Sequence, residues 1–357
     1  MKQKLIFTNQ VGVEFDNLIM QYNNPQVVII ADSNTAELVV PKICKTSKVA
    51  AGATLITIKA GDDNKNLEQL TAIWQTLSQL GATRSSIVVN VGGGVVSDIG
   101  GFAASTYKRG LRYINIPTTV LAAVDASVGG KTGINFNGYK NQIGTFAEAE
   151  TSIISANFFD TLPLKQLSSG YAEMLKHGLL DSTTAVKKLI AQSPAELHHH
   201  PSAMLELIST SVAVKQHIVE HDFTETGLRK ALNLGHTAGH AFESFAMKHK
   251  TAIPHGYAVA YGLVVALILS HTRTAFPSEM LHSIASYICE NYGAMGITCN
   301  DYPELLDAMH QDKKNDNAKS VNFTLLKNAG EPQINSQIGD EDICVAFDIY
   351  RDLMHLA

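Results

Sequence analysis

Cysteine is scarce in this chain, and its four copies are widely spaced. Cys44, Cys289, Cys299 and Cys344 form no CxxC pair. Isolated thiols provide neither a disulfide framework nor a cysteine zinc site, and they suit a reducing compartment. Any metal site must therefore use histidine and carboxylate side chains.

Long apolar runs are also missing. The N-terminal sequence MKQKLIFTNQVGVEF has no apolar stretch of signal-peptide length, and no segment approaches the roughly 20 apolar residues of a membrane span. The longest stretch, 259–269, is interrupted by Gly262 and is expected to be a buried helix. The net charge of −5 gives no reason to expect a nucleic-acid-binding surface. We therefore expect a cytoplasmic protein with no membrane or nucleic-acid partner.

The 357 residues, 45% of them hydrophobic, are enough for two domains. The first part alternates apolar runs with a helical pattern at 66–81, which is typical of an α/β parallel sheet; the runs cover 26–32, 53–61, 85–94 and 111–119. After about Leu164 the patterns become mostly helical. We predict an α/β domain at 1–163 and a helical domain at 164–357.

A glycine-rich segment, GGGVVSDIGGF (92–102), directly follows a predicted strand. Glycines allow a tight turn and close backbone approach to a pyrophosphate, and the next helix would present free N–H groups to it. The spacing differs from GxGxxG, so a tight turn without a ligand remains the alternative. Asp98 fits either a helix cap or a hydrogen bond to ribose.

The segment 116–144 gathers hydroxyl, amide and cationic groups in a stretch that we expect to be rich in loops. Lys131 and Lys140 stand beside glycines and suit a phosphate or carboxylate ligand. An exposed basic loop is the alternative.

Histidines and a carboxylate suggest metal chemistry in the second half. Glu173 lies three residues before Lys176 on a predicted helix, and His255 starts another helix after a proline. A further set is spaced three or four residues apart, so its members would share one helical face; it contains Arg229, Asn233, His236 and His240. One carboxylate and two imidazoles leave coordination positions open for substrate. Histidines that only fill a core are the alternative.

The residue after His236 is threonine, so the HExxH pattern of a metalloprotease is absent.

The motifs together resemble those of 3-dehydroquinate synthases. GGGVVSD, RG-x3-INIPTT, VDASVGGKTGIN, KNQIGTF, TLP, GYAEMLKHG, GLRKALNLGHTAGHAFE, HG and DKKN occur in that family's order, between about residues 26 and 330. The resemblance implies an N-terminal, Rossmann-like NAD-binding α/β domain and a C-terminal α-helical metal-binding domain. It also implies a homodimer.

The resemblance also assigns site residues. The positions that match the ligands of zinc, or of cobalt in its place, are Glu173, His236 and His255. The positions that match catalytic and substrate-binding groups are Lys131, Asn141, Lys176, Lys215, Arg229, Asn233, His240 and Lys313, with Arg109 offered across a dimer interface. Lys314 is the alternative to Lys313, and both lysines also fit plain surface charges. The positions that match NAD contacts are Asp32, Asp62, Lys65, Gly93, Gly94, Val95, Asp98, Thr118, Thr119, Leu121, Asp125, Lys140, Phe158, Thr161 and Leu162.

The implied reaction converts 3-deoxy-D-arabino-heptulosonate 7-phosphate, a phosphorylated sugar acid, to 3-dehydroquinate and phosphate. It proceeds by transient NAD-mediated oxidation at C5, phosphate elimination, re-reduction, ring opening and intramolecular aldol closure. The chain departs from the common sequence motifs of the family at His177, at Tyr257 and in GDDNK (61–65). None of these departures removes a predicted metal ligand. Three alternatives stay open: a metal-dependent NAD polyol or glycerol dehydrogenase, a sister sugar-phosphate cyclase, and a catalytically silent paralogue.

Overall fold

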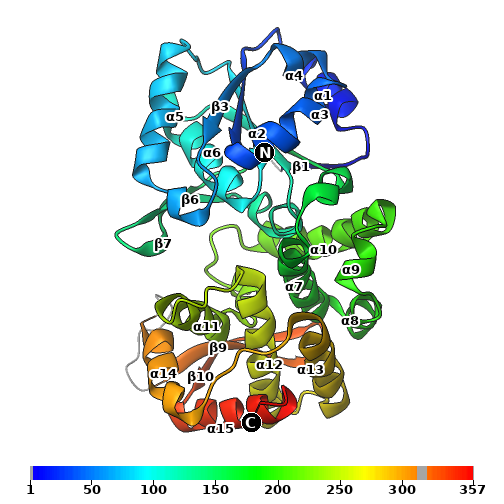
Figure 1. Cartoon of the computed structure of the whole chain (residues 1–357), viewed down its shortest axis with the longest axis vertical. Coiled ribbons are helices and arrows are strands. Elements are labelled where there is room, and N and C mark those ends of the chain that lie inside the picture. The colour runs from blue at the N-terminus through cyan, green and yellow to red at the C-terminus, as the bar shows by residue number, and fades with distance from the viewer. Residues whose placement is uncertain (1–2, 312–319, 357) are drawn as a thin grey trace. The chain divides into compact units, whose positions relative to one another are not determined.

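The computed structural model describes residues 3–311 and 320–356, and these fall into two compact units (Figure 1). Unit 1 comprises Met1–Pro163 and His198–Gln216, and unit 2 comprises Leu164–Leu197 and His217–Ala357. Helix α10 (Pro201–His221) therefore starts in unit 1 and ends in unit 2. The predicted domains, 1–163 and 164–357, do not account for the assignment of His198–Gln216 to unit 1. NAD binding by the first domain and metal and substrate binding by the second stay predictions.

Within the described residues, unit 1 is built on a six-stranded parallel sheet in the order β1-β8-β5-β4-β2-β3. The strands are β1 (Lys4–Phe7), β2 (Val27–Asp32), β3 (Thr54–Ile58), β4 (Ile87–Gly92), β5 (Arg112–Pro117) and β8 (Thr151–Ile154). The central strands β2 and β4 are almost continuously buried, because a parallel sheet is covered on both faces. The α/β prediction for this part is confirmed.

Helices connect the strands of unit 1 (Figure 1). They are α1 (Val11–Ile19), α2 (Ser33–Leu38), α3 (Val40–Cys44), α4 (Lys48–Gly52), α5 (Leu67–Gln79) and α6 (Gly94–Thr106), with short turns η1 (Asp62–Asn64), η2 (Tyr107–Arg109), η3 (Ala122–Ala126) and η4 (Ala156–Thr161). Asn66 caps α5, and Leu70, Ile73 and Leu77 project from one face of it. They join Val96 of α6 in the core on one side of the sheet.

The segment 116–144 is more regular than the sequence prediction of a loop-rich stretch. It contains the π-helical turn η3 and a hairpin of β6 (Lys131–Phe136) and β7 (Tyr139–Phe146). The hairpin turn uses Asn137 and Gly138, with φ of 49° and 80°. An Asn-Gly pair with two positive φ values is the favoured two-residue hairpin turn, so this dipeptide was the missed signal.

Unit 2 is mainly helical, as expected. Its elements are α7 (Leu164–Asp181), α8 (Thr183–Ile190), α9 (Pro194–Leu197), η5 (Leu228–Asn233), α11 (His236–Lys248), α12 (His255–Thr274), α13 (Ser278–Tyr292), η6 (Cys299–Asp301), α14 (Tyr302–His310) and α15 (Asp340–Leu353). It also contains an antiparallel hairpin of β9 (Val321–Asn328) and β10 (Glu331–Ile338), which the sequence analysis did not predict.

Helix α12 is the central helix of unit 2 and contacts α7, α11, α13, α15 and β9. Within the described chain it is the one helix whose length and composition would allow a membrane span. However, 78% of its most apolar window is buried inside the protein, as in the core helix of a folded domain.

Glycines let α7, α11 and α12 approach closely. A Cβ on Gly256, at the start of α12, would lie 1.8 Å from the Ser169 carbonyl oxygen on α7. A Cβ on Gly262 would lie 2.0 Å from the carbonyl oxygen of Gly235 and 2.6 Å from the nitrogen of Gly239. The Gly256 N–H also donates to the Ser169 hydroxyl over 3.0 Å. Backbone-to-backbone contact therefore fixes the separation of these three helices.

The residues 229–240 do not form one helix, so the prediction of a single helical face is wrong. Gly235 has a φ of 76° and separates the 3-10 turn η5 from α11. Its missing side chain leaves room for Leu263 of α12, whose side chain would lie 2.8 Å from a Cβ. Arg229 and Asn233 therefore belong to η5, whereas His236 and His240 belong to α11.

The contact at Gly256 yields a prediction about stability. Gly256→Ala should lower the free energy of unfolding by about 1–3 kcal/mol or more, because the added methyl group must displace a helix backbone. Urea denaturation measures this. Gly296→Ala is the control: its Cβ would meet nothing within 4 Å, so stability should be unchanged or slightly raised. Equal stability of the two variants would contradict close packing at Gly256.

Candidate functional site

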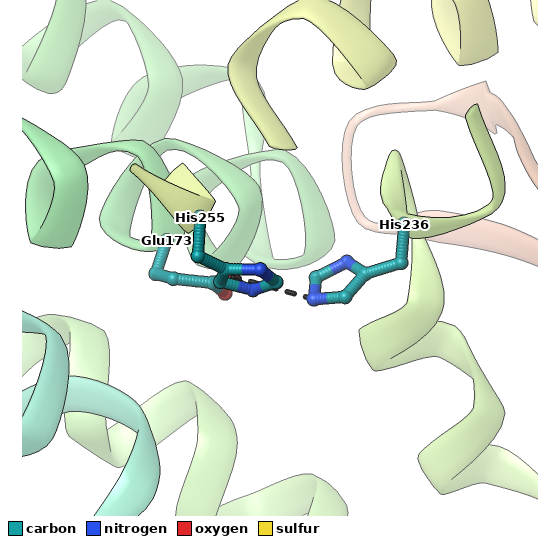
Figure 2. Close-up of side chains that lie close together, drawn as sticks. All are labelled: Glu173, His236 and His255. Atoms are coloured by element: carbon teal, nitrogen blue, oxygen red, sulfur yellow. Dashed lines mark ion pairs between the residues drawn. The ribbon is translucent and has the colours of Figure 1, made fainter. Parts of the chain in front are cut away.

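Three side chains from three helices of unit 2 converge on one point (Figure 2). Glu173 comes from α7, His236 from the first residue of α11 and His255 from the first residue of α12. Glu173 Oε1 lies 3.4 Å from His236 Nε2 and 3.7 Å from His255 Nε2. One ligand atom from each residue lies within 4.8 Å of the others.

These separations fit a shared divalent cation. Zinc binds imidazole nitrogen and carboxylate oxygen at about 2.0–2.2 Å, so two ligand atoms around a tetrahedral ion stand about 3.4 Å apart. The observed 3.4 Å and 3.7 Å match that spacing and exceed the usual hydrogen-bond length. The three residues could therefore hold a metal ion and leave positions open on it.

The charges around Glu173 balance a buried carboxylate. Its side chain is fully buried and forms an ion pair with Lys176, one turn along α7, whose side chain is 2% exposed. Burial alone would raise the pKa of Glu173, but the positive charge of Lys176 and the contact with His236 lower it well below its ordinary value. The carboxylate is therefore held in its charged, ligand-competent form.

The two imidazoles differ in their affinity for protons. Burial and the nearby Lys176 charge lower the pKa of His236 to about 4, despite the opposing effect of Glu173. Burial also lowers the pKa of His255, but its contacts with Glu173 and Glu243 outweigh burial and raise it to about 10. His236 is therefore neutral at pH 7, and a cation at this point would have to displace a proton from His255.

His240 stands next to the cluster. Its ring centroid lies 5.5 Å from that of His236, one turn away on α11, and 6.0 Å from that of His255. A third imidazole is thus available beside the possible ligands.

Arg229 and Asn233 are held by the loop that precedes η5. The Asp222 carboxylate accepts hydrogen bonds from the backbone N–H groups of Thr226, Gly227 and Arg229 at 3.0, 2.7 and 3.0 Å. The buried Arg229 side chain donates to a backbone carbonyl, and Asn233 Nδ2 donates to Glu225 Oε1 over 3.0 Å. A single carboxylate therefore organises the loop that leads into η5, the turn that carries both residues.

Two of the predicted NAD residues, Asp32 and Gly93, lie at the switch point of the sheet. The chain leaves β2 toward β3 on one side and leaves β4 toward β5 on the other, and ligands of such sheets bind beyond the strand ends at that place. Asp32 ends β2 and caps α2, accepting from the N–H groups of Asn34 and Thr35 at 2.9 Å. Gly93 caps α6 without a side chain. The two positions therefore follow neighbouring strands at the switch point.

A second group of predicted residues gathers around Lys65. Its ammonium lies 3.0 Å from Asp98 Oδ2, 2.6 Å from Asn141 Oδ1 and 3.8 Å from Asp62 Oδ1, and Lys140 lies 3.5 Å from the other Asp62 oxygen. Burial raises the pKa of Asp98 although the Lys65 charge opposes it. Asp98 does not cap α6, so the cap interpretation is wrong. The hydrogen bond to ribose stays a prediction.

Lys215 and Asp125 form a further pair within unit 1. The Lys215 ammonium lies 2.5 Å from the Asp125 carboxylate and 2.6 Å from its carbonyl oxygen. This contact ties α10 to the turn η3 and gives the buried cation a partner.

The remaining predicted positions are more scattered. Gly94 and Val95 are half-buried in the first turn of α6, and Thr118, Thr119 and Leu121 follow β5. Three more lie in or directly after the turn η4: Phe158 is buried, Thr161 is exposed and Leu162 is half-buried. Lys131 and Arg109 lie outside this turn and are exposed. Lys313 and its alternative Lys314 lie outside the described residues.

The sequence analysis gave no role to two residues that organise the site. Glu243 contacts His255 through a 3.3 Å approach to Nδ1, and Asp222 orders the loop before η5. Glu243 lies seven residues after His236, which is two helical turns, so it shares a helix face with His236 and His240. That spacing was a usable signal for Glu243. Asp222 gave no comparable signal.

Solved structures define the class of this fold. 2-Deoxy-scyllo-inosose synthase, complexed with carbaglucose-6-phosphate, NAD+ and Co2+, has a TM-score of 0.81 at 21% identity over 98% of this chain and 96% of that one. A 2-epi-5-epi-valiolone synthase from Streptomyces hygroscopicus, with NAD+ and Zn2+ bound, has a TM-score of 0.82 at 23% identity over 99% and 97%. A glycerol dehydrogenase from Schizosaccharomyces pombe is more distant, with a TM-score of 0.66 at 15% identity over 99% and 90%. The chain therefore has the fold that these synthases share, and a dehydrogenase has a more distant form of it.

Sequence comparison narrows the class to one family. The models of the 3-dehydroquinate synthase N-terminal and C-terminal regions match residues 55–169 and 170–315. The 3-dehydroquinate synthase of Parabacteroides distasonis is 43% identical over 98% of each chain, and that of Pyrococcus furiosus is 40% identical over 84% of this chain and 85% of its own. The chain belongs to the 3-dehydroquinate synthase family, which confirms the resemblance seen in the sequence.

The Asp222 loop yields a prediction about pH. Hydrogen bonds from Gly227, Arg229 and Thr226 outweigh desolvation and lower the pKa of Asp222 to about 2. The stabilisation is complete above the pKa of the unfolded chain, about 3.9, and is lost as pH falls toward 2. Asp222→Asn should therefore flatten part of the acid decline of the urea midpoint between pH 5 and pH 2.

The matched control is Asp352→Asn, an exposed carboxylate near the end of α15. It should keep the acid profile of the parent protein. An unchanged profile for Asp222→Asn would show that the loop does not depend on this carboxylate.

Proposed function

We propose that this chain converts 3-deoxy-D-arabino-heptulosonate 7-phosphate to 3-dehydroquinate and phosphate, the reaction of its family. The observation that carries the proposal is the meeting of Glu173, His236 and His255 within 4.8 Å, in a chain 43% identical to a 3-dehydroquinate synthase over almost its full length. A silent paralogue would have no reason to keep these ligand atoms at cation spacing.

NAD and a divalent cation, zinc or cobalt, are the proposed cofactors. The two related cyclases were solved with NAD+ and with Co2+ or Zn2+, which supports the same groups here. When bound, NAD would accept and return one hydride while the cation acidifies the hydroxyl to be oxidised. Glu173, His236 and His255 would hold the cation, because one carboxylate and two imidazoles leave positions for substrate oxygens.

The strand ends at the switch point of unit 1 are the proposed NAD site. Gly93 and Gly94 allow close backbone approach, and the free N–H groups at the start of α6 favour the pyrophosphate. Asp32 ends the neighbouring strand β2. The other residues proposed to line this site are Asp62, Lys65, Val95, Asp98, Thr118, Thr119, Leu121, Asp125, Lys140, Phe158, Thr161 and Leu162.

The substrate carries a carboxylate and a phosphate, so cations should dominate its recognition. The proposed contacts are Lys131, Asn141, Lys176, Lys215, Arg229, Asn233 and Lys313. Two of these cations, Lys176 and Lys215, are buried beside an acidic partner, Glu173 and Asp125 in turn, and are therefore already fixed in place. Fixed cations stabilise phosphate and oxyanion charge without reorganising during the reaction.

His240 is the proposed group for proton movement at the C5 hydroxyl. It stands beside the proposed cation ligands, and an imidazole nitrogen can exchange a proton with a nearby substrate hydroxyl as a general base and acid. The leaving phosphate itself is proposed to remove the C6 proton. The chain otherwise contributes by holding one flexible intermediate in reactive geometry.

We further propose that the protein works in the cytoplasm as a homodimer with no membrane partner. The exposed position of Arg109, on the turn η2, supports a role across a subunit interface. Its φ of 67° holds the turn in a left-handed conformation.

Phosphate release from the heptulosonate phosphate tests the reaction. The parent protein with NAD should release phosphate without net NADH, and a chelator should stop release until zinc is restored. Stoichiometric NADH would instead indicate a polyol or glycerol dehydrogenase. Release from glucose 6-phosphate, with none from the heptulosonate, would indicate a sister cyclase. No turnover of any of these substrates would contradict the proposal.

The ligand assignment yields a separate prediction. His236→Ala should lose zinc on dialysis and show no measurable turnover, because two remaining ligands hold the ion weakly. Metal analysis after dialysis measures retention. His282→Ala, an exposed histidine on α13, is the control and should retain zinc like the parent. Full zinc content in His236→Ala would exclude this residue as a ligand.

A further inference from the structure

We propose that Glu243 is a positioning residue that holds the His255 imidazole with its proton on Nδ1, so that Nε2 is free to bind the cation. Glu243 lies on α11, and its carboxylate is 10% exposed. Its Oε2 lies 3.3 Å from His255 Nδ1, while His255 Nε2 lies 3.7 Å from Glu173 Oε1. The two ring nitrogens therefore face two different carboxylates.

The chemistry of neutral imidazole makes this arrangement directional. Only one ring nitrogen carries a proton, and the hydrogen bond that it donates decides which nitrogen keeps a lone pair. A carboxylate beyond Nδ1 selects the Nδ1–H form and leaves Nε2 as the ligand. It also makes that nitrogen more electron-rich, as in carboxylate–histidine–metal triads.

His236 has the same orientation with a different acceptor. Its Nδ1 lies 3.2 Å from the carbonyl oxygen of Leu234, while its Nε2 faces Glu173. Both imidazoles thus direct Nδ1 outward and Nε2 inward. His236 relies on a backbone group that no substitution removes, whereas His255 relies on a side chain that can be exchanged.

His255 has the greater need of such a restraint. Its side chain is 31% exposed, against 12% for His236, so packing fixes its ring less firmly. It is also the first residue of α12, directly after the extended Pro254. A carboxylate projecting from the neighbouring helix α11 supplies the orientation that local packing does not.

The inference rests on the proposed metal site and is tested by zinc affinity rather than by turnover. The intact protein is stripped of metal and titrated with zinc against a competing chromophoric chelator. Glu243→Met keeps the side-chain volume without an oxygen acceptor and should bind zinc about 10- to 100-fold more weakly. Glu243→Gln keeps an acceptor for Nδ1–H and should recover most of the loss. Glu279→Gln, an exposed residue of α13, is the control and should match the parent.

A second measurement reads the tautomer directly. In zinc-loaded protein with 15N-labelled histidine, the His255 resonance, assigned by its loss in His255→Gln, should show a protonated Nδ1. Glu243→Met should shift that signal while those of the other histidines stay in place. If Glu243→Met does not fold, Glu243→Ala takes its place in both measurements.

The outcomes separate the two proposals. A parent protein that binds no zinc would overturn the metal site itself, and this inference with it. A parent that binds zinc, together with a Glu243→Met protein of equal affinity, would overturn the role of Glu243 alone. Glu243→Gln as weak as Glu243→Met would also overturn positioning, because the acceptor would then have no effect.

Discussion

The close meeting of three helix backbones is the constraint on which the metal cluster depends. The ligands sit on α7, α11 and α12, so their spacing follows from how closely those helices pack. Gly256 rests against the Ser169 carbonyl, and Gly262 rests against Gly235 and Gly239, with no room for a methyl group at either place. Side chains at these points would separate the helices by more than the tolerance of a coordination sphere. The cluster is thus a consequence of packing in the core of unit 2.

Charge balance is the second requirement. A fully buried carboxylate is costly unless cations or hydrogen bonds compensate it. Glu173 meets this requirement with Lys176 and the two imidazoles. In unit 1 the buried partners are the cations, with Lys65 beside Asp98 and Lys215 beside Asp125. Groups proposed for phosphate and carboxylate recognition are therefore ordered by acidic partners. Binding then costs little further side-chain entropy, which is the physical meaning of a preorganised site.

The two units position their proposed ligand-binding residues by different means. In unit 1 the order of the parallel strands makes β2 and β4 neighbours at the switch point, and Asp32 and Gly93 cap the helices that follow these two strands. In unit 2 His236 and His255 are the first residues of two helices, and the loop organised by Asp222 leads into the turn η5, which carries Arg229. Relatives with this fold at 12–23% identity include cyclases and dehydrogenases, so the fold alone does not choose the reaction.

The sequence by itself determined the parallel sheet, the helical second half, the glycine turn before α6 and the family, because periodicity and local motifs are written in neighbouring residues. It missed the hairpin β9–β10 and predicted one helix over 229–240. Local helix propensity does not reveal the left-handed conformation of Gly235, which packing against Leu263 requires. Only the tertiary structure brought Glu173, His236 and His255 to cation spacing and set Glu243 behind His255. Those distances arise from contacts between segments up to 82 residues apart, which no local pattern encodes.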